Sequence, residues 1–175
     1  MKVIVIGHGM VGHKLLECLA EQSAAAAEIT VLCEEPRPAY DRVHLSEFFS
    51  GKSADDLSLV EPGFFDRDDM VLRLNTKAVS IDRDAHTVTT SAGETLAYDK
   101  LVIATGSYAF VPPVPGKDRT DCFVYRTIED LEAMQECGAR SKTGVVVGGG
   151  LLGLSARRRC ATWGSKRMSS NSRRV

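Results

Sequence analysis

Three glycines near the start of the chain have the spacing of a phosphate-binding turn. Gly7, Gly9 and Gly12 form a GxGxxG pattern directly after a short apolar run. In such a pattern the first glycine permits a tight turn, the second lets the backbone approach a pyrophosphate, and the third lets a helix pack closely on a sheet. The helix that starts with Met10 and Val11 turns its free N–H groups and positive dipole end toward the anion. These residues therefore indicate binding of a phosphate-containing ligand.

The elements around this motif follow the order strand, turn, helix, strand and acid. The apolar runs at residues 2–6 and 29–33 have the length of buried parallel strands. Between them, apolar residues recur at roughly helical spacing: Val11, Leu15, Leu16 and Leu19. Glu34 follows at the distance where an acid accepts the ribose hydroxyls of a dinucleotide, with Glu35 as second choice. We predict a dinucleotide-binding βαβ unit in which His8 faces solvent.

The composition bounds the class of protein. A chain of 175 residues that is 43% hydrophobic has the length for one domain, or one and a fraction, with a buried core. No apolar run is long enough for a signal peptide or a membrane span, so we expect a cytoplasmic protein without a membrane partner. The five cysteines are scattered without metal or disulfide spacing, which fits a reducing compartment and predicts no metal site.

Further strands are predicted after this unit. The β-branched runs at 70–74, 78–81 and 86–90 predict a small antiparallel or three-stranded insert. We expect Val79, in the run that lies between the other two, to offer its backbone to an adenine ring. Another buried strand is predicted at 98–103, and it runs into three small residues, Ala104, Thr105 and Gly106. Small residues at a strand end allow the backbone to approach a bound nucleotide closely.

The segment between the unit and these strands is irregular because it contains two prolines. Arg42 stands where a loop could return to a bound pyrophosphate, an anion that suits the planar guanidinium. Pairing of Arg42 with Asp41 is an equally good interpretation from the local sequence. Residues 48–59 predict a short helical stretch with a break at Gly51, after which Ser53 is a plausible N-cap.

A second glycine pattern occurs about 140 residues after the first. A proline-rich crossover at 107–116 leads to a capping box at 127–130, which predicts a packing helix without chemistry. The strand-like run at 145–147 then enters the second pattern, Gly148, Gly150 and Gly153. Two such turns imply two nucleotide lobes, one holding a flavin and the other a nicotinamide cofactor that delivers hydride to it.

In this order, the motifs resemble those of the FAD-dependent pyridine nucleotide-disulfide oxidoreductases. The resemblance is carried by the two glycine turns, Glu34-Glu-Pro36, Tyr40-Asp-Arg42-x-x-Leu-Ser46 and Ala104-Thr-Gly106. More narrowly, the strings at 49–59, 104–119 and 123–131 are similar to the nitrite reductase large-subunit branch of that family. The resemblance covers residues 1–154. Related ferredoxin and rubredoxin reductases often carry a lysine after the Leu-Ser pair, whereas this chain has Glu47.

The resemblance implies an α/β fold. It consists of a Rossmann-type FAD lobe with a small β insert at 1–111, a crossover and packing helix at 112–143, and the start of a Rossmann-type NAD(P) lobe at 144–154. The implied cofactor contacts are the residues of the first glycine turn (Gly7, Gly9, Met10, Val11, Gly12), the acids Glu34 and Glu35, Arg42, Ser46, Val79, the strand end Ala104, Thr105 and Gly106, and the second glycine turn (Gly148, Gly150, Gly153). We predict no acid–base catalyst, because hydride transfer depends on positioning.

The nitrite reductase branch implies a particular electron path. The flavin would take hydride from NAD(P)H and pass electrons to siroheme and iron–sulfur centres in a C-terminal region beyond the resemblance, where nitrite becomes ammonia. A small subunit would be a partner of the intact protein. Two alternatives stay open, namely a related FAD-dependent ferredoxin or rubredoxin reductase and a non-enzymatic nucleotide-binding fragment.

Charge is distributed unevenly along the chain. Residues 155–175 contain seven basic residues and no acid, which leaves 15 basic and 23 acidic residues, a net charge of −8, in residues 1–154. In the family the pattern continues after Leu154 with a glutamate, a helix and a strand that ends in an acid. Residues 155–175 have no coherent apolar face, and we expect that strand to be missing.

Back-translation offers a reason for this change. Loss of one G from CTGGAG gives CTGAGC, which encodes Leu154 and Ser155. When possible codons for residues 169–175 are read one base earlier, they encode the expected strand and its acid. We therefore predict that residues 155–175 are an out-of-frame tail on a truncated enzyme that is inactive alone. The alternative, a basic extension that binds nucleic acid, has one aromatic residue, Trp163, among its charges.

Overall fold

The computed structural model describes residues 1–22, 27–148, 150, 153, 156 and 167–171. It divides into two compact units. The first unit comprises Met1–Asp41 and Ser58–Ser107, and the second comprises Arg42–Leu57 and Tyr108–Val175. Residues 42–57, which the predicted flavin lobe at 1–111 includes, group with the second unit. The sequence-based domain boundaries stay a prediction.

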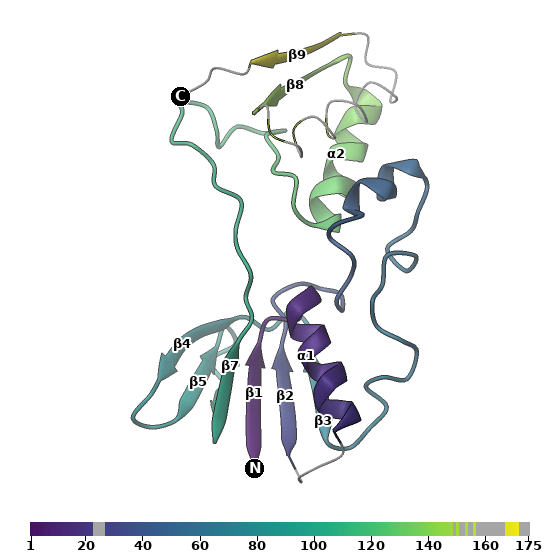
Figure 1. Ribbon diagram of the computed structural model, residues 1–175. Helices are drawn as coiled ribbons and strands as arrows, with labels where there is room; N and C mark the ends of the chain where they lie inside the picture. The colour runs from purple at the N-terminus through teal and green to yellow at the C-terminus, as the bar shows by residue number, and fades with distance from the viewer. Residues whose placement is uncertain (23–26, 149, 151–152, 154–155, 157–166, 172–175) are drawn as a thin grey trace. The chain divides into compact units, whose positions relative to one another are not determined.

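A four-stranded parallel sheet in the order β3-β2-β1-β7 forms the centre of the first unit (Figure 1). Its strands are β1 (Lys2–Ile6), β2 (Glu28–Leu32), β3 (Met70–Arg73) and β7 (Lys100–Ile103). β1 pairs with β2 on one side and β7 on the other, so that Ile6 lies between Leu32 and Ile103. The strands are continuous apolar runs because both faces of this sheet are covered.

Helix α1 (Met10–Glu21) covers one face of the parallel sheet. Its Leu16 packs into a buried cluster with Val3, Val5, Ile29, Val31 and Met70. Two of the apolar residues at helical spacing, Val11 and Leu19, are 76% and 38% exposed. Gly12, His13 and Leu16 form the buried face instead. At 3.6 residues per turn, Val11 is rotated by about 100° from Gly12 and points away from the sheet.

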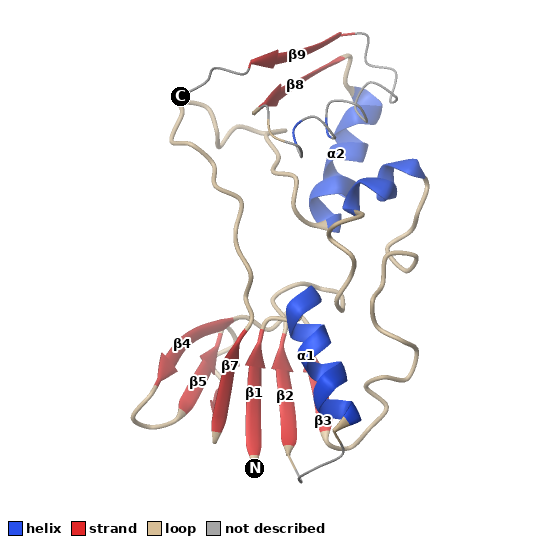
Figure 2. Ribbon diagram, viewed as in Figure 1, coloured by secondary structure: helices blue, strands red, loops and turns tan. Residues whose placement is uncertain are grey.

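A three-stranded antiparallel sheet in the order β4-β5-β6 packs on the opposite face (Figure 2). Its strands are β4 (Ala78–Asp82), β5 (Thr87–Thr90) and β6 (Thr95–Ala97). Val88 of β5 joins a buried cluster with the alternate residues of the parallel sheet, Ile4, Ile6 and Leu32. These side chains point to the face opposite Val3 and Val5 because strand residues alternate.

The predicted insert is confirmed as antiparallel and three-stranded, but one of its strands was assigned wrongly. The run at 70–74 belongs to the parallel sheet, where Met70 pairs with Ile29 of β2. Its apolar sequence and the complete burial of Met70 are typical of a strand covered on both faces. The third strand of the insert is β6, which follows the turn at Gly93.

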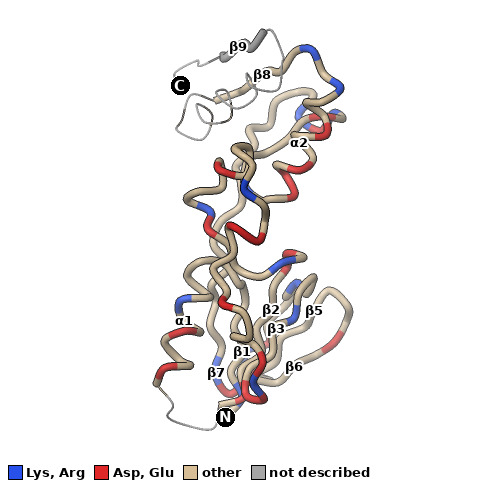
Figure 3. The backbone as a smooth tube through the Cα atoms, turned by 90° about the vertical axis from the view of Figure 1, so that its right-hand side faces the viewer, with Lys and Arg blue, Asp and Glu red and all other residues tan. Residues whose placement is uncertain are grey.

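The second unit contains the 3-10 helix η1 (Leu45–Ser50), helix α2 (Ile128–Arg140) and two parallel strands, β8 (Thr143–Val147) and β9 (Arg167–Asn171). The predicted capping box at the start of α2 is confirmed. The Thr127 hydroxyl accepts the Asp130 N–H at 3.2 Å, and the Asp130 carboxylate accepts the Thr127 N–H at 2.9 Å. Acidic residues occupy the first turn of α2 and Arg140 the last, which suits the helix dipole (Figure 3).

Two expectations for this unit are wrong. The helical stretch expected over 48–59 begins at Leu45 and ends at Ser50, because Gly51 takes a left-handed conformation with a φ of +99°. Ser53 then caps a single turn through Asp56 and not a helix. The strand expected to be missing from the tail is present as β9, whose backbone pairs with β8 in register Val145 to Ser169.

Candidate dinucleotide-binding site

The first glycine turn follows β1 at the carboxyl edge of the parallel sheet. Gly7 has a φ of +102°, and its N–H donates to the carbonyl of Leu32 at 2.8 Å. A Cβ at Gly7 would collide with the Ala104 carbonyl at the end of β7, and a Cβ at Gly12 would collide with the Gly7 carbonyl. Glycine is therefore required at both positions by close backbone packing.

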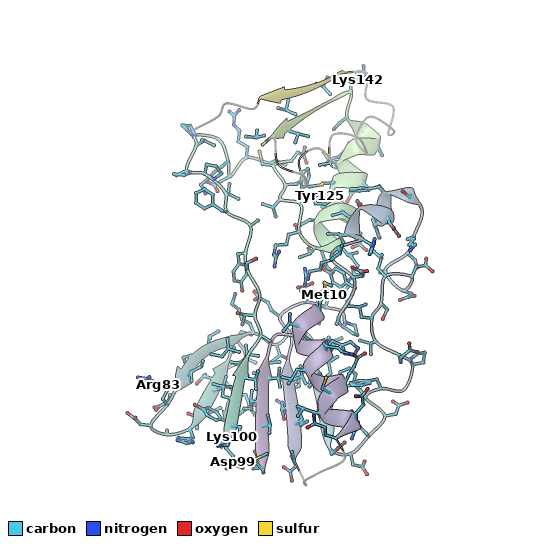
Figure 4. All side chains as sticks on the ribbon, viewed as in Figure 1. Met10, Arg83, Asp99, Lys100, Tyr125 and Lys142 are labelled. Carbon is cyan, nitrogen blue, oxygen red and sulfur yellow. The ribbon has the colours of Figure 1, made fainter. Side chains whose placement is uncertain are left out.

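The space above the turn is open at the second glycine. Gly9 is the N-cap of α1 with an extended backbone, and an added Cβ there would meet nothing within 4 Å in the described structure. No side chain caps this helix end, and its first turn holds no acid. Met10, which Figure 4 labels at this end of α1, and Val11 are both exposed. Uncapped N–H groups beside open space fit a pyrophosphate.

The end of β7 lies against this turn. The Ala104 N–H donates to the carbonyl of Ile6 at 2.7 Å, and the Thr105 nitrogen would lie 2.9 Å from a Cβ at Gly7. Gly106 follows with a φ of +68°. The structure therefore brings together the glycine turn and the strand end that the sequence analysis singled out separately.

The two predicted ribose-binding acids follow β2, the strand beside β1. Glu34 Oε1 accepts a hydrogen bond from Lys77 Nζ at 2.7 Å, and both side chains are half-exposed. Glu35 Oε2 accepts the Tyr40 hydroxyl at 2.9 Å. Sequence analysis missed Lys77, because a single lysine 43 positions from its partner belongs to no local pattern.

The expectation that His8 faces solvent is wrong. Its side chain is 4% exposed, and Nδ1 accepts the Ala39 N–H at 3.1 Å. The ring makes edge contacts with His13 and Phe65 at centroid distances of 5.3 and 5.4 Å. Burial and, to a smaller extent, the neighbouring His13 lower the pKa of His8 to about 4. The ring is therefore neutral at neutral pH, and Nδ1 is available as an acceptor.

His13, in the first turn of α1, is a buried residue that the sequence analysis did not single out. Its Nε2 lies 2.9 Å from the carbonyl of Leu59, which can only accept, so Nε2 donates. The ring contacts Phe64 at a centroid distance of 5.0 Å. The sequence does contain a signal for this burial. His13 follows Gly12 and precedes Leu16 by three residues, so it lies on the helix face that meets the sheet.

Three predicted contacts lie away from the turn in sequence. Arg42 Nη1 donates to the carbonyl of Arg126 at 3.2 Å, and Ser46 belongs to η1; both residues are in the second unit. Val79 is exposed on β4 at the point where the register with β5 shifts. Their contact with a cofactor stays a prediction.

The second glycine turn repeats the internal packing of the first. Gly148 has a φ of +119°, and a Cβ at Gly153 would collide with the Gly148 carbonyl. A Cβ at Gly150 would meet nothing within 4 Å in the described part of the chain. The other residues between Gly148 and Gly153 lie outside the described structure.

Other kinds of site find no support in the described residues. In them no group of three or more His, Cys, Asp or Glu side chains is arranged to hold a metal ion. None of the four cysteines in the described ranges forms a disulfide. None of the helices in the described ranges combines the length and the apolar character needed to cross a bilayer.

Comparison with known proteins decides the family. A family model described as pyridine nucleotide-disulphide oxidoreductase matches residues 1–166. The chain belongs to this family. It is 54% identical over 157 residues to the nitrite reductase (NADH) large subunit of Escherichia coli and 52% identical over 155 residues to the nitrite reductase [NAD(P)H] large subunit of Klebsiella oxytoca. These matches cover 89% and 88% of this chain but 18% and 16% of the relatives' length.

Solved structures agree with the fold. The NADH:rubredoxin oxidoreductase of Clostridium acetobutylicum superposes with a TM-score of 0.81 at 25% identity, over 97% of this chain and 43% of the other. A ferredoxin reductase from Rhodopseudomonas palustris superposes with a TM-score of 0.86 at 24% identity, over 97% and 42% of the two chains. The α/β fold with a Rossmann-type parallel sheet is thus confirmed.

Proposed function

We propose that this chain is an FAD-binding, NAD(P)H-oxidising module in which the first glycine turn holds the FAD pyrophosphate. The observation that carries the proposal is the open, uncapped N-terminus of α1 above Gly9, framed by Gly7 and Ala104. Open space and free N–H donors at one point favour a phosphate ligand over a side chain. Glu34, at the end of the neighbouring strand, would accept the ribose hydroxyls.

The remaining predicted contacts complete this assignment. Thr105 and Gly106 would border the dinucleotide, and Arg42 would pair with a phosphate. The second glycine turn, Gly148 to Gly153, would face a nicotinamide cofactor. The bound flavin would supply two-electron chemistry by accepting a hydride from that cofactor. The chain's own contribution is to bind and orient the two rings, so no acid–base residue is assigned.

The test is flavin reconstitution of the purified chain. FAD should bind with a shifted visible absorbance band, and Gly9→Val should weaken its affinity by at least about tenfold while the free energy of unfolding stays unchanged. Stability should hold because Gly9 has ordinary backbone angles and open space around it. The matched control is Gly150→Val, which changes the equivalent position of the second turn. Equal FAD affinity in wild type and Gly9→Val would refute the proposal.

A narrower function follows from the similarity to nitrite reductase large subunits. We propose that the flavin passes its electrons toward nitrite reduction, in an assembly with siroheme and iron–sulfur centres and a small subunit. A Bacillus subtilis relative at 35% identity is an assimilatory nitrate reductase electron transfer subunit, which supports a place in such an electron path. Bleaching of the bound flavin by NADH under anaerobic conditions tests the first step. A ferredoxin- or rubredoxin-type reductase is the alternative, supported by the superposed structures.

The reading-frame hypothesis for residues 155–175 also stays a proposal. It is decided by the DNA across the codons for Leu154 and Ser155. A sequence of CTGGAG would place the family's glutamate after Leu154 and restore an acid for nicotinamide ribose binding. If the genome itself reads CTGAGC, the base is missing from the gene, and residues 155–175 are what the gene encodes.

A further inference from the structure

A continuous chain of hydrogen bonds joins the first glycine turn to two loop residues that are twenty positions apart. His8 Nδ1 accepts the Ala39 N–H at 3.1 Å, the Ala39 carbonyl accepts the Leu59 N–H at 3.0 Å, and the Leu59 carbonyl accepts His13 Nε2 at 2.9 Å. The bridge between Tyr40 and Ser58 lies directly beside it. All of these residues belong to the first unit.

Each histidine has a fixed role in this chain of bonds. Ala39 presents an N–H, so His8 Nδ1 must be unprotonated, whereas Leu59 presents a carbonyl, so His13 Nε2 must carry a proton. The two roles are therefore opposite, one acceptor and one donor. Both rings are almost completely buried, and they contact each other edge to face. Phe65 contacts the His8 ring, and Phe64 contacts the His13 ring.

The chain of bonds begins and ends at the predicted phosphate site. His8 lies between Gly7 and Gly9, and His13 follows Gly12, so the two rings fix both ends of the glycine turn. The same hydrogen bonds fix Ala39 and Leu59, the two ends of the loop. The residues between these ends in the sequence include Arg42 and Ser46, two of the predicted cofactor contacts.

We propose that His8 and His13 are positioning residues that hold the glycine turn in its dinucleotide-binding conformation by bonding to Ala39 and Leu59. This proposal rests on the proposed function, because it concerns affinity for the same dinucleotide. The histidines do not touch the ligand. Their effect is to remove alternative conformations of the turn, and a preorganised turn loses less free energy on binding.

Substitutions that keep or remove the bonding atom test the proposal. In His8→Asn the amide oxygen can replace Nδ1 as acceptor, whereas His8→Leu has no acceptor. In His13→Gln the amide N–H can replace Nε2 as donor, whereas His13→Leu has no donor. His86→Asn is the control, because His86 is an exposed histidine with a φ of +52° that asparagine tolerates. FAD affinity and amide hydrogen exchange at Ala39 and Leu59 are measured for all five variants at neutral pH.

The expected result is a paired pattern. His8→Leu should accelerate amide exchange at Ala39, and His13→Leu should accelerate it at Leu59. Each leucine variant should also weaken FAD binding by about fivefold to tenfold, which corresponds to the loss of one hydrogen bond. The FAD affinity of His8→Asn, His13→Gln and His86→Asn should stay within about twofold of wild type. A merely structural role would lower the unfolding temperature of the amide variants as well and leave the affinity of the folded protein unchanged. That pattern, or unaltered exchange in both leucine variants, would overturn the proposal.

The two proposals fail in different ways. Should wild-type protein retain no FAD, the proposed function fails, and amide exchange alone then decides whether His8 and His13 brace the turn. Accelerated exchange that Asn and Gln reverse supports the brace, and unchanged exchange overturns it.

Discussion

The two glycine turns have the same internal packing in different surroundings. In each, the third glycine lies against the carbonyl of the first, Gly12 on Gly7 and Gly153 on Gly148. A Cβ at Gly7 would also collide with Ala104, which directly follows the neighbouring strand β7, whereas one at Gly148 would meet no described atom within 4 Å. The motif thus specifies a turn by itself, but neighbouring strands determine how tightly that turn is held.

The strands that lead into the two turns differ in the same way. Four of the five residues of β1 are buried, and Val5 is completely inaccessible, whereas Val147 of β8 is 80% exposed. β1 has a partner strand on each side, and β8 pairs with β9 within the described structure. A turn that follows a buried strand should therefore respond to substitution more strongly than the same turn after an exposed one.

Alanine at the first glycine of the buried turn should cause the largest single loss of stability. Gly7→Ala combines an unfavourable φ with a backbone collision and should cost about 4 kcal/mol of unfolding free energy, whereas Gly148→Ala carries the φ penalty alone, about 2 kcal/mol. Hydrogen-exchange mass spectrometry with urea resolves the two units separately. Equal losses would show that the neighbouring strand end at Ala104 adds nothing to the requirement for glycine.

The pH dependence of stability should also distinguish the turns. His8 has a folded pKa of about 4, below its ordinary value of 6.5, so the unfolded chain binds a proton that the folded unit does not between these values. Stability of the first unit should therefore fall as pH decreases through this window, by up to about 3 kcal/mol. The second turn has Gly149 in the corresponding position and contributes no such effect.

His8→Asn removes the titrating group and should flatten this dependence, as measured by urea denaturation at a series of pH values. An identical pH dependence in wild type and His8→Asn would assign the effect to other groups.

Truncation of the strand side chains extends the comparison. Val5→Ala leaves a cavity in the buried cluster under α1 and should cost about 2–3 kcal/mol, whereas Val147→Ala should change stability by less than about 0.5 kcal/mol. Thermal and urea unfolding of the two variants measure both values. A loss in Val147→Ala as large as that in Val5→Ala would contradict this comparison.

Sequence alone could predict the features that depend on near neighbours. The strand, glycine turn and helix at residues 2–21 and the capping box at Thr127 were predicted because their defining contacts are local. The strand end at Ala104 was found from its small residues, although its contact with Gly7 became visible only in the structure.

Features that depend on distant segments could not be predicted in this way. The burial of His8 requires Ala39 and Phe65, which no local pattern connects to the turn. The run at Met70 was assigned to the insert because an apolar run does not reveal its partner strand. The same limit applies to the ion pair of Glu34 with Lys77.

Substitutions in that ion pair should have only a small effect on stability, and they distinguish a role of Glu34 in stability from a role in FAD binding. Glu34→Gln and Lys77→Met should each cost less than about 1 kcal/mol of stability, because exposed ion pairs contribute little. If Glu34 accepts ribose hydroxyls, Glu34→Gln should also weaken FAD binding by about tenfold, the worth of a hydrogen bond to a charged group. Lys77→Met keeps the carboxylate and should leave FAD affinity within about twofold of wild type. Equal affinity losses in the two variants would instead mean that the ion pair, and not the carboxylate, matters for binding.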